Sequence, residues 1–387
     1  MLKNIRLLYL HNFLNDLRFQ EAFLAIYFAQ ITGSYTSGMA VFAVATITSA
    51  IMDIPTGILS DRMGRRFTLV LASLCSTLGI ACFAFAAGAW MLFVGATLCG
   101  LSQCLINGNN DALLYETLKT EGMEKRFPHY QGRAKGMYQA GLALSALAAS
   151  FLTGNGLHLV FVLGIVPQAL SIFVSLLFDE PKVHVQKPKK NLAHLKEACV
   201  QIYRNPRLMV LVIAQAISYG AGESKYQFQV AFFNVLWPTW ALGLYRAMGH
   251  SFGVLGFWVA GSVLARFKET TMLVVRDVYW FVTQMTGVIL SNFFTPFLFG
   301  TGTFVYGIGM VARDHLLQKE FSDEQRATMG SVASFAGSIV FSLVAFGLGI
   351  ISDHFGLATG VGFGVAMTVT SLPLYIWLFR KKFGHEI

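Results

Sequence analysis

The sequence has little charge for its length. Only 13% of its 387 residues are Asp, Glu, Lys or Arg, whereas a soluble domain usually carries about 25%. Its five cysteines form no C-x-x-C pair, so we expect free thiols, no disulfide and no metal site. It also contains no G-x-x-x-x-G-K-[ST] loop and no H-E-x-x-H pair. With no room for a soluble nucleotide-binding domain, we expect no cofactor and no enzymatic activity.

Apolar residues fill the space that charge leaves. The chain is 55% hydrophobic and its mean hydropathy is +0.57. Its apolar runs reach the roughly 20 residues needed to cross a bilayer, and they do not alternate as the strands of a β-barrel would. We therefore predict an all-α membrane protein with twelve transmembrane helices. The expected spans are 7–31, 36–59, 67–87, 90–115, 135–154, 157–178, 207–232, 238–265, 271–291, 294–314, 328–350 and 357–379.

The basic residues support this count. With the N-terminus in the cytoplasm, 25 of the 29 lysines and arginines fall in cytoplasmic segments and the other four fall inside spans. This is the positive-inside pattern, and it places both termini in the cytoplasm. The net charge of +9 is thus a topology signal, and we expect the lipid bilayer rather than nucleic acid as the partner.

The longest polar segment divides the spans six and six. We expect an N-terminal bundle over 1–178, a cytoplasmic linker over 179–206 that ends in a short amphipathic helix, and a C-terminal bundle over 207–387. "GILSDR" from Gly57 and "GSVLAR" from Gly261 lie at equivalent places in the two halves, as do "NDALLYETL" and "RDHLLQKEF". A duplicated six-helix unit predicts such a match. Because one chain holds both halves, a monomer is sufficient.

The loop between the second and third spans carries a dense motif, "GILSDRMGRRFTLV". Its pattern G-x-L-x-D-R-x-G-R-R-x-x-L resembles the signature of the major facilitator superfamily (MFS), and in length, topology and central linker the whole chain resembles bacterial twelve-helix members that export drugs and other small molecules. The motif residues are Gly57, Leu59, Asp61, Arg62, Gly64, Arg65, Arg66 and Leu69. The resemblance implies two pseudo-symmetric six-helix bundles and a location in the bacterial inner membrane.

The motif also suggests a cytoplasmic gate. Gly64 permits a tight turn. Asp61 can face a helix N-terminus, where negative charge is favoured; in the family this is the start of the eleventh helix, here near Thr328–Gly330. The arginines can pair with acids at the end of the fourth helix, for which Asp111 and Glu116 are the candidates. A similar "SDHFG" run around Asp353 lies at the outer end of span eleven, and we interpret it as a turn and cap, with an outer gate contact as the alternative.

Ionisable residues inside spans are costly and tend to mark a transport pathway. The first helix is unusually polar, and in helical projection His11, Asn15, Arg18 and Glu21 share one face. We predict a substrate or proton pathway formed by Asp16, Arg18, Glu21, Glu223, Lys225 and Arg246, with structural ion pairs as the alternative for each. Arg276 and Asp277 are expected near the inner membrane surface.

These observations favour a secondary active transporter that works by alternating access. A buried carboxylate beside a mobile cation can carry a proton, so Asp16, Glu21 or Glu223 would couple transport to protons in an efflux antiporter. The fifth helix lacks the G-P-x-x-G run and the fourth lacks the internal arginine of many drug antiporters. Four cations within the spans favour an alternative, a carrier that could also work in uptake, for an anionic organic solute such as a carboxylate metabolite or a siderophore. A sensor with a transporter fold is a third possibility, which a transport assay would test.

Overall fold

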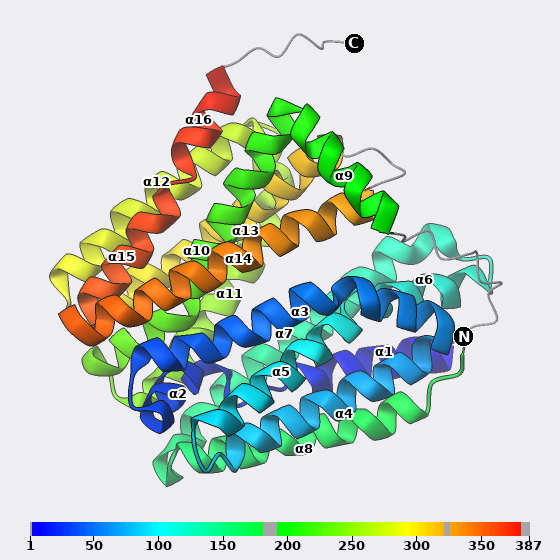
Figure 1. Ribbon diagram of the computed structural model, residues 1–387, viewed down its shortest axis with the longest axis horizontal. Coiled ribbons are helices and arrows are strands. Elements are labelled where there is room, and N and C mark those ends of the chain that lie inside the picture. Colours follow the sequence, from blue (N-terminus) through cyan, green and yellow to red (C-terminus); the bar gives the residue numbers. More distant parts are fainter. Residues whose placement is uncertain (1, 181–191, 321–325, 381–387) are drawn as a thin grey trace. The chain divides into compact units, whose positions relative to one another are not determined.

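The computed structural model describes residues 2–180, 192–320 and 326–380. Every regular element among these residues is helical (Figure 1). Nine helices in the described part of the chain are long and apolar enough to cross a membrane. The first, fifth and seventh predicted spans are helical but are not among the nine, in keeping with their many polar residues. The predicted all-α membrane fold is confirmed.

The elements of the first half follow the predicted spans within several residues. They are α1 (Leu2–Asn15), η1 (Glu21–Phe23), α2 (Leu24–Thr32), α3 (Tyr35–Met63), α4 (Arg65–Ala84), α5 (Ala89–Ile106), α6 (Asn109–Lys119), η2 (Glu124–Arg126), α7 (Phe127–Leu152), η3 (Thr153–Asn155) and α8 (Leu157–Leu176). In Figure 1, α4 runs beside α5 and α8, which are its main packing partners.

The second half repeats the pattern. Its elements are α9 (Leu192–Arg204), α10 (Pro206–Leu236), α11 (Thr239–Leu264), α12 (Glu269–Leu290), α13 (Thr295–Glu320), α14 (Arg326–Phe355), α15 (Leu357–Val369) and α16 (Leu372–Arg380). Here α10 packs on α14 and α15, and α12 packs on α13. The predicted linker helix is α9, which packs on α10 and α14 and buries Ile202 beside Leu208 and Leu211. Residues 181–191 of the predicted linker lie outside the described residues.

The contacts divide the chain into two compact units. Unit 1 is made of the described parts of Met1–Thr32, Val44–Lys190 and Thr239–Ala247. Unit 2 is made of the described parts of Gly33–Ala43, Asn191–Pro238 and Met248–Ile387. The beginning of α3 therefore belongs to unit 2, and the beginning of α11 belongs to unit 1. The two long helices α3 and α11 are each shared between the units.

The first predicted span is not one helix. α1 ends at Asn15, and regular helix resumes only at Leu24 after the short turn η1. The cause is local competition for the backbone carbonyls of the last turn. The Nε atom of Arg18 and the Nε2 atom of Gln168 both donate to the carbonyl oxygen of Asn15, each at 3.0 Å. The helical projection that placed Arg18 and Glu21 on one face with Asn15 is therefore wrong.

Glycines allow neighbouring helices of unit 1 to approach closely. An alanine at Gly79 of α4 would place its Cβ 2.6 Å from the sulfur of Cys99 on α5, and one at Gly95 would place it 2.9 Å from the carbonyl oxygen of Gly79. Small residues of this kind bring helix backbones together in membranes. A different glycine, Gly108, interrupts the fourth span with a φ of 76° and separates α5 from α6.

Candidate functional site

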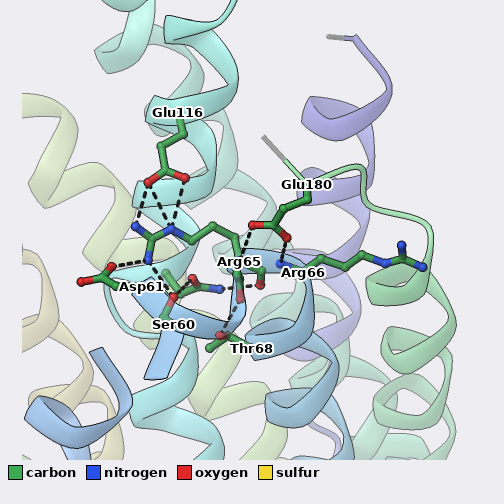
Figure 2. Close-up of polar contacts among 9 residues, drawn as sticks. Ser60, Asp61, Arg65, Arg66, Thr68, Glu116 and Glu180 are labelled. Carbon is green, nitrogen blue, oxygen red and sulfur yellow. Dashed lines mark hydrogen bonds and ion pairs between the residues drawn. The ribbon is translucent and has the colours of Figure 1, made fainter. Parts of the chain in front are cut away.

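The charged loop is a glycine turn between two helices. α3 ends at Met63, Gly64 adopts a φ of 92°, and α4 begins at Arg65. This left-handed backbone is one that residues with a Cβ rarely adopt. The turn directs the first residues of α4 toward the end of the fourth span (Figure 2).

Arg65 is the centre of the polar cluster in Figure 2. Its Nε lies 3.1 and 3.2 Å from the two carboxylate oxygens of Glu116, and its Nη2 lies 2.7 Å from one of them. Its Nη1 donates to the Ser60 hydroxyl at 2.7 Å and pairs with Asp61 at 3.0 Å. Of the two acids proposed for the arginines, Glu116 is the one that pairs with Arg65. The planar guanidinium explains why one side chain can bind three groups at once.

The other motif residues lie around this centre. Gly57 lies within the last two turns of α3, and Arg62 is exposed at its end. Arg66 donates from Nη2 to the carbonyl oxygen of Leu176, the last residue of α8. Asp111 accepts a hydrogen bond from Gln131 at 2.8 Å, so its described partner is an amide and not an arginine. The contact expected between Asp61 and the start of the eleventh span stays a prediction.

Sequence reasoning missed one member of the cluster, Glu180. Its two carboxylate oxygens accept hydrogen bonds from the backbone amides of Arg65 and Arg66, at 2.6 and 2.9 Å. It thus caps the N-terminus of α4, where the helix dipole favours a negative charge. A Cβ on Gly64 would lie 2.8 Å from this carboxylate, which is a second reason for glycine there. The only sequence signal was an acid directly after the sixth span.

The neighbouring Asp179 is held by α1. It accepts a hydrogen bond from the ammonium of Lys3 at 2.7 Å, while its backbone exchanges two hydrogen bonds with the side chain of Asn4. The hydrogen bond from Lys3 lowers the pKa of the Asp179 carboxyl below its ordinary value. The chain that leaves α8 is therefore fastened at two successive acids, one to α1 and one to α4.

The break after α1 forms a second polar cluster in unit 1. Asp16 is 4% exposed and pairs with Arg18 at 3.1 Å. Two neighbouring helices approach the break at glycines. An alanine at Gly141 of α7 would place its Cβ 2.7 Å from the carbonyl oxygen of Phe13, and one at Gly164 of α8 would lie 2.4 Å from Oε1 of Gln20. The cluster is thus enclosed by tightly packed helices.

Several oxygens in this cluster are buried without a hydrogen-bond donor among the described residues. They are Oδ1 of Asn15, Oε1 of Gln20 and Oε2 of Glu21, while the contact of Oδ1 of Asp16 is its ion pair with Arg18. Buried polar atoms are usually satisfied, and a group of unsatisfied acceptors at one place is favourable for a bound proton, a cation or a donor-bearing solute. The predicted pathway residues Asp16, Arg18 and Glu21 are therefore brought together by the break.

In unit 2 the predicted pathway residue Lys225 of α10 is 3% exposed. Its ammonium donates to Oε1 of Gln284 and lies 4.9 Å from the ring centre of Trp280, both on α12. Glu223 lies two residues before it and accepts a hydrogen bond from Gln227 at 2.8 Å. Arg246 is 2% exposed on α11, in the part of that helix that belongs to unit 1.

The expected position of Arg276 and Asp277 near the inner membrane surface stays a prediction, and in the structure both side chains are buried within the protein. They are 2% and 3% exposed and form an ion pair at 2.8 Å. Arg276 also donates to the Ser218 hydroxyl at 2.9 Å, and Asp277 accepts from Ser371 at 2.8 Å. The pair is neutralised and hydrogen-bonded within the protein, which makes its burial tolerable.

Asp353 caps a helix within unit 2. Its carboxylate accepts from the backbone amides of Tyr35 and Thr36 at 2.8 and 2.9 Å and from the Thr36 hydroxyl at 2.6 Å. It therefore holds the N-terminus of α3 against the end of α14. An alanine at Gly349 would lie 2.4 Å from Cα of Thr36, so the two helices are also in close backbone contact.

Apolar helices long enough to cross a membrane, with a charged glycine turn between α3 and α4, define a polytopic membrane protein. The sequence matches the Major Facilitator Superfamily over residues 13–375, so the chain belongs to that family. The chain is 24% identical over 358 residues to the "Uncharacterized MFS-type transporter YxaM" of Bacillus subtilis (strain 168), covering 88% of this chain and 86% of the relative. It is 23% identical to the class H tetracycline resistance protein of Pasteurella multocida over 57% of this chain and 55% of that protein.

A third relative, named "Probable 4-methylmuconolactone transporter", comes from Cupriavidus pinatubonensis (strain JMP 134 / LMG 1197); it is 24% identical over 82% of this chain and 76% of its own length. Among solved structures, a variant of the nucleoside transporter NupG has a TM-score of 0.82 at 14% identity and covers 97% of this chain and 100% of that chain. A bacterial homologue of the human lysosomal transporter Spinster has a TM-score of 0.75 at 16% identity, covering 97% and 96%. At these identities the structures establish the fold alone.

Proposed function

We propose that this MFS transporter is a secondary active carrier that moves a small organic molecule across the cytoplasmic membrane by proton-coupled alternating access, in the direction of efflux. The observation that supports coupling is the break after α1. There Asp16 is buried against Arg18, and the neighbouring acceptors of Asn15 and Glu21 have no described donor. A carboxylate in such a place can release its proton when its cation moves and regain it when the site reopens.

The direction of transport is supported by the gate motif and by one relative. The loop keeps every signature position, and Arg65 binds Glu116, Asp61 and Ser60 within unit 1. The tetracycline resistance protein shares this family. A gate of this kind would stabilise the cytoplasmic side when it is closed, so that solute leaves on the outer side.

A second candidate is a carrier for an anionic organic solute. It is favoured by Lys225, which is buried and makes no ion pair in the part of the chain that the structure describes. The relative named for 4-methylmuconolactone is equally similar and shows that members this close differ in what they transport.

The first test is a thermal-shift screen of the detergent-purified protein with amphiphilic cations, neutral lipophiles and organic anions at acidic and neutral pH. A ligand that binds only the folded state raises its stability. Stabilisation by cations or neutral compounds that weakens at low pH supports proton-linked efflux. Stabilisation by carboxylates supports the second candidate.

The compound identified in this way is then used in proteoliposomes with an imposed pH gradient. We expect neutralisation of Asp16, Glu21 and Glu223 together to abolish gradient-driven accumulation but to leave exchange of solute at equal pH. The exposed acid Asp179, changed to Asn, is the matched control. Accumulation that survives the triple change would contradict proton coupling at these sites, and flux only in the uptake direction would contradict efflux.

A further inference from the structure

Among its described residues, unit 2 holds two buried cations, Lys225 and Arg276, and they differ in one respect. Arg276 has a carboxylate partner, Asp277, at 2.8 Å. Lys225 has an amide oxygen and an aromatic face but no ion pair among the described residues. An amide oxygen and a cation–π contact offset only part of the cost of removing an ammonium from water. Arg276 therefore has an ion pair of its own, whereas Lys225 shares the charge of the same carboxylate, Asp277, without contacting it. Two buried cations and one carboxylate leave a net positive charge at this place.

The described acids on the surrounding helices have partners of their own. The helices packed on α10 are α9, α13, α14, α15 and α16; α15 and α16 carry no acid in their sequences, and Glu197 of α9 has an interaction of its own. Both oxygens of Asp277 are used, one by Arg276 and one by Ser371. Among the other acids whose side chains the structure describes, Glu223 accepts from Gln227, Asp314 pairs with Arg313, Glu269 contacts His315, and Asp353 accepts from the amides of Tyr35 and Thr36. Glu223 and Glu269 have further interactions as well.

The groups around Lys225 are held in place. The indole nitrogen of Trp280 donates to the carbonyl oxygen of Gly302 at 2.8 Å, and the ring stacks on Tyr306 at 5.9 Å. A Cβ on Gly302 would lie 3.0 Å from that indole nitrogen and 3.1 Å from Nε2 of Gln284. Because Gly302 has no side chain, nothing at this position displaces the Gln284 amide from its place beside Lys225. An ammonium and an amide N–H can together bind the two oxygens of one carboxylate.

From this geometry we infer that Lys225, Gln284 and Trp280 form a subsite for the carboxylate group of a transported organic anion, which supplies the direct ion pair that Lys225 lacks among the described residues. Lys225 provides the charge, Gln284 the second donor, and Trp280 the wall that fixes the ammonium. The inference rests on the proposed transport function and names the class of solute for it. It corresponds to the anionic alternative and makes Arg276 a structural residue.

One test needs no ligand. Replacing Gln284 by Glu puts a carboxylate where the amide oxygen already contacts Lys225. We expect Q284E to raise the thermal unfolding midpoint when Lys225 is present and to lower it in the K225Q background, where the new acid would be buried alone. If Q284E lowers the midpoint in both backgrounds, the site does not require a negative charge and the inference is wrong.

The second test measures binding. Acetate, benzoate and succinate are titrated against the purified protein at constant ionic strength and pH 7, each paired with its neutral amide, with unfolding followed by intrinsic fluorescence. We expect at least one carboxylate to stabilise the wild type saturably while its amide does not. Its affinity should fall tenfold or more in K225Q and in Q284E, and stay within twofold in K268Q, which removes an exposed lysine. K225R, which keeps the charge, should retain part of the response.

The outcomes separate this inference from the transport proposal. Equal affinity in wild type and K225Q, no response to any carboxylate, or the same saturable response to chloride would overturn the carboxylate subsite. None of these results bears on flux, because the assay contains no membrane gradient. Conversely, loss of proton-driven flux in the Asp16, Glu21 and Glu223 variant would leave carboxylate binding intact. If K225Q elutes as an aggregate, the thermal unfolding midpoint and the carboxylate affinity of Q284E, each compared with wild type, still test the subsite.

Discussion

The contact between Arg65 and Glu116 gives the sharpest prediction for the gate motif. The guanidinium makes three short contacts to the carboxylate, and the two side chains are only 17% and 20% exposed. Exposed ion pairs contribute about 0.2–1 kcal/mol, whereas breaking a buried pair costs about 3–5 kcal/mol. Discounting for the remaining exposure, we expect a coupling free energy of about 2 kcal/mol between R65Q and E116Q.

The single changes should differ. R65Q also removes the contacts of Arg65 to Ser60 and Asp61, at 2.7 and 3.0 Å, whereas E116Q leaves them in place. R65Q should therefore be the more destabilising of the two. R65K, which keeps the charge but loses the planar fork, should recover less than half of the loss. The free energy of unfolding is measured by SDS titration in mixed micelles for the wild type, both single variants and the double variant.

A matched control is the adjacent pair of Arg313 and Asp314, whose atoms also lie 2.7 Å apart but whose acid is 54% exposed. Its coupling should stay below about 0.5 kcal/mol because solvent screens it. A coupling for R65Q and E116Q as small as that of this control pair would refute the reasoning. Full recovery by R65K would show that charge alone, and not the fork, is required.

Three further results are expected. E180Q should destabilise the protein by about 1 kcal/mol, because it weakens the charged cap of α4, and amide exchange of Arg65 and Arg66 should rise with it. D353A should cost about 1–2 kcal/mol through the lost cap of α3, and cleavage by an added protease near Thr36 should increase; unchanged cleavage would contradict the cap. The pKa of Asp179 is lowered in the folded protein, so its stabilising contact to Lys3 should be complete above the ordinary value of 3.8 and lost as pH falls below it. The difference in melting temperature between wild type and D179N should disappear over that acidic range.

Much of the fold could be predicted because its signals are long. Apolar runs and the placement of lysine and arginine both extend over the whole chain, and they agree. The breaks could not be predicted, since each depends on a few residues. At Asn15 the helix stops because side chains from elsewhere, including Gln168 of α8, take its carbonyl. Apolar periodicity along α1 contains no information about a donor that arrives more than a hundred residues later.

The candidate site divides in the same way. Asp61, Gly64 and Arg65 are close in sequence and form a recognisable pattern, so the motif could be identified before the structure. Glu180 could not, because its role is to accept two backbone amides and no side-chain pattern marks that. For Lys225 the sequence indicated only a cation inside a span. That it has no acid partner while Arg276 has one follows from the side-chain positions.

The two halves also show which parts of the motif belong to the common six-helix unit. Aligning Gly57 with Gly261 places Arg65 opposite Glu269, and aligning Asp111 with Asp314 places Glu116 opposite Lys319. The charges of the pair are therefore exchanged in the second half. In unit 2, Glu269 at the start of α12 contacts His315 near the end of α13 at 2.7 Å, so a polar contact again joins the start of the third span to the end of the fourth.

Other members of the motif have no such counterpart. The positions of Asp61 and Gly64 are taken by Ala265 and Lys268, and α12 starts without a left-handed glycine before it. A polar contact at this place thus occurs in both halves, with the acid and the basic side chain exchanged. Asp61 and the left-handed turn at Gly64, next to Glu180, therefore have no counterpart at the aligned positions of the second half. We therefore expect a gating role to depend on Asp61 and Gly64 more than on the ion pair itself. Changing Asp61 should impair gating and cost less stability than R65Q, because it removes one contact of Arg65 and leaves those to Glu116 and Ser60 in place.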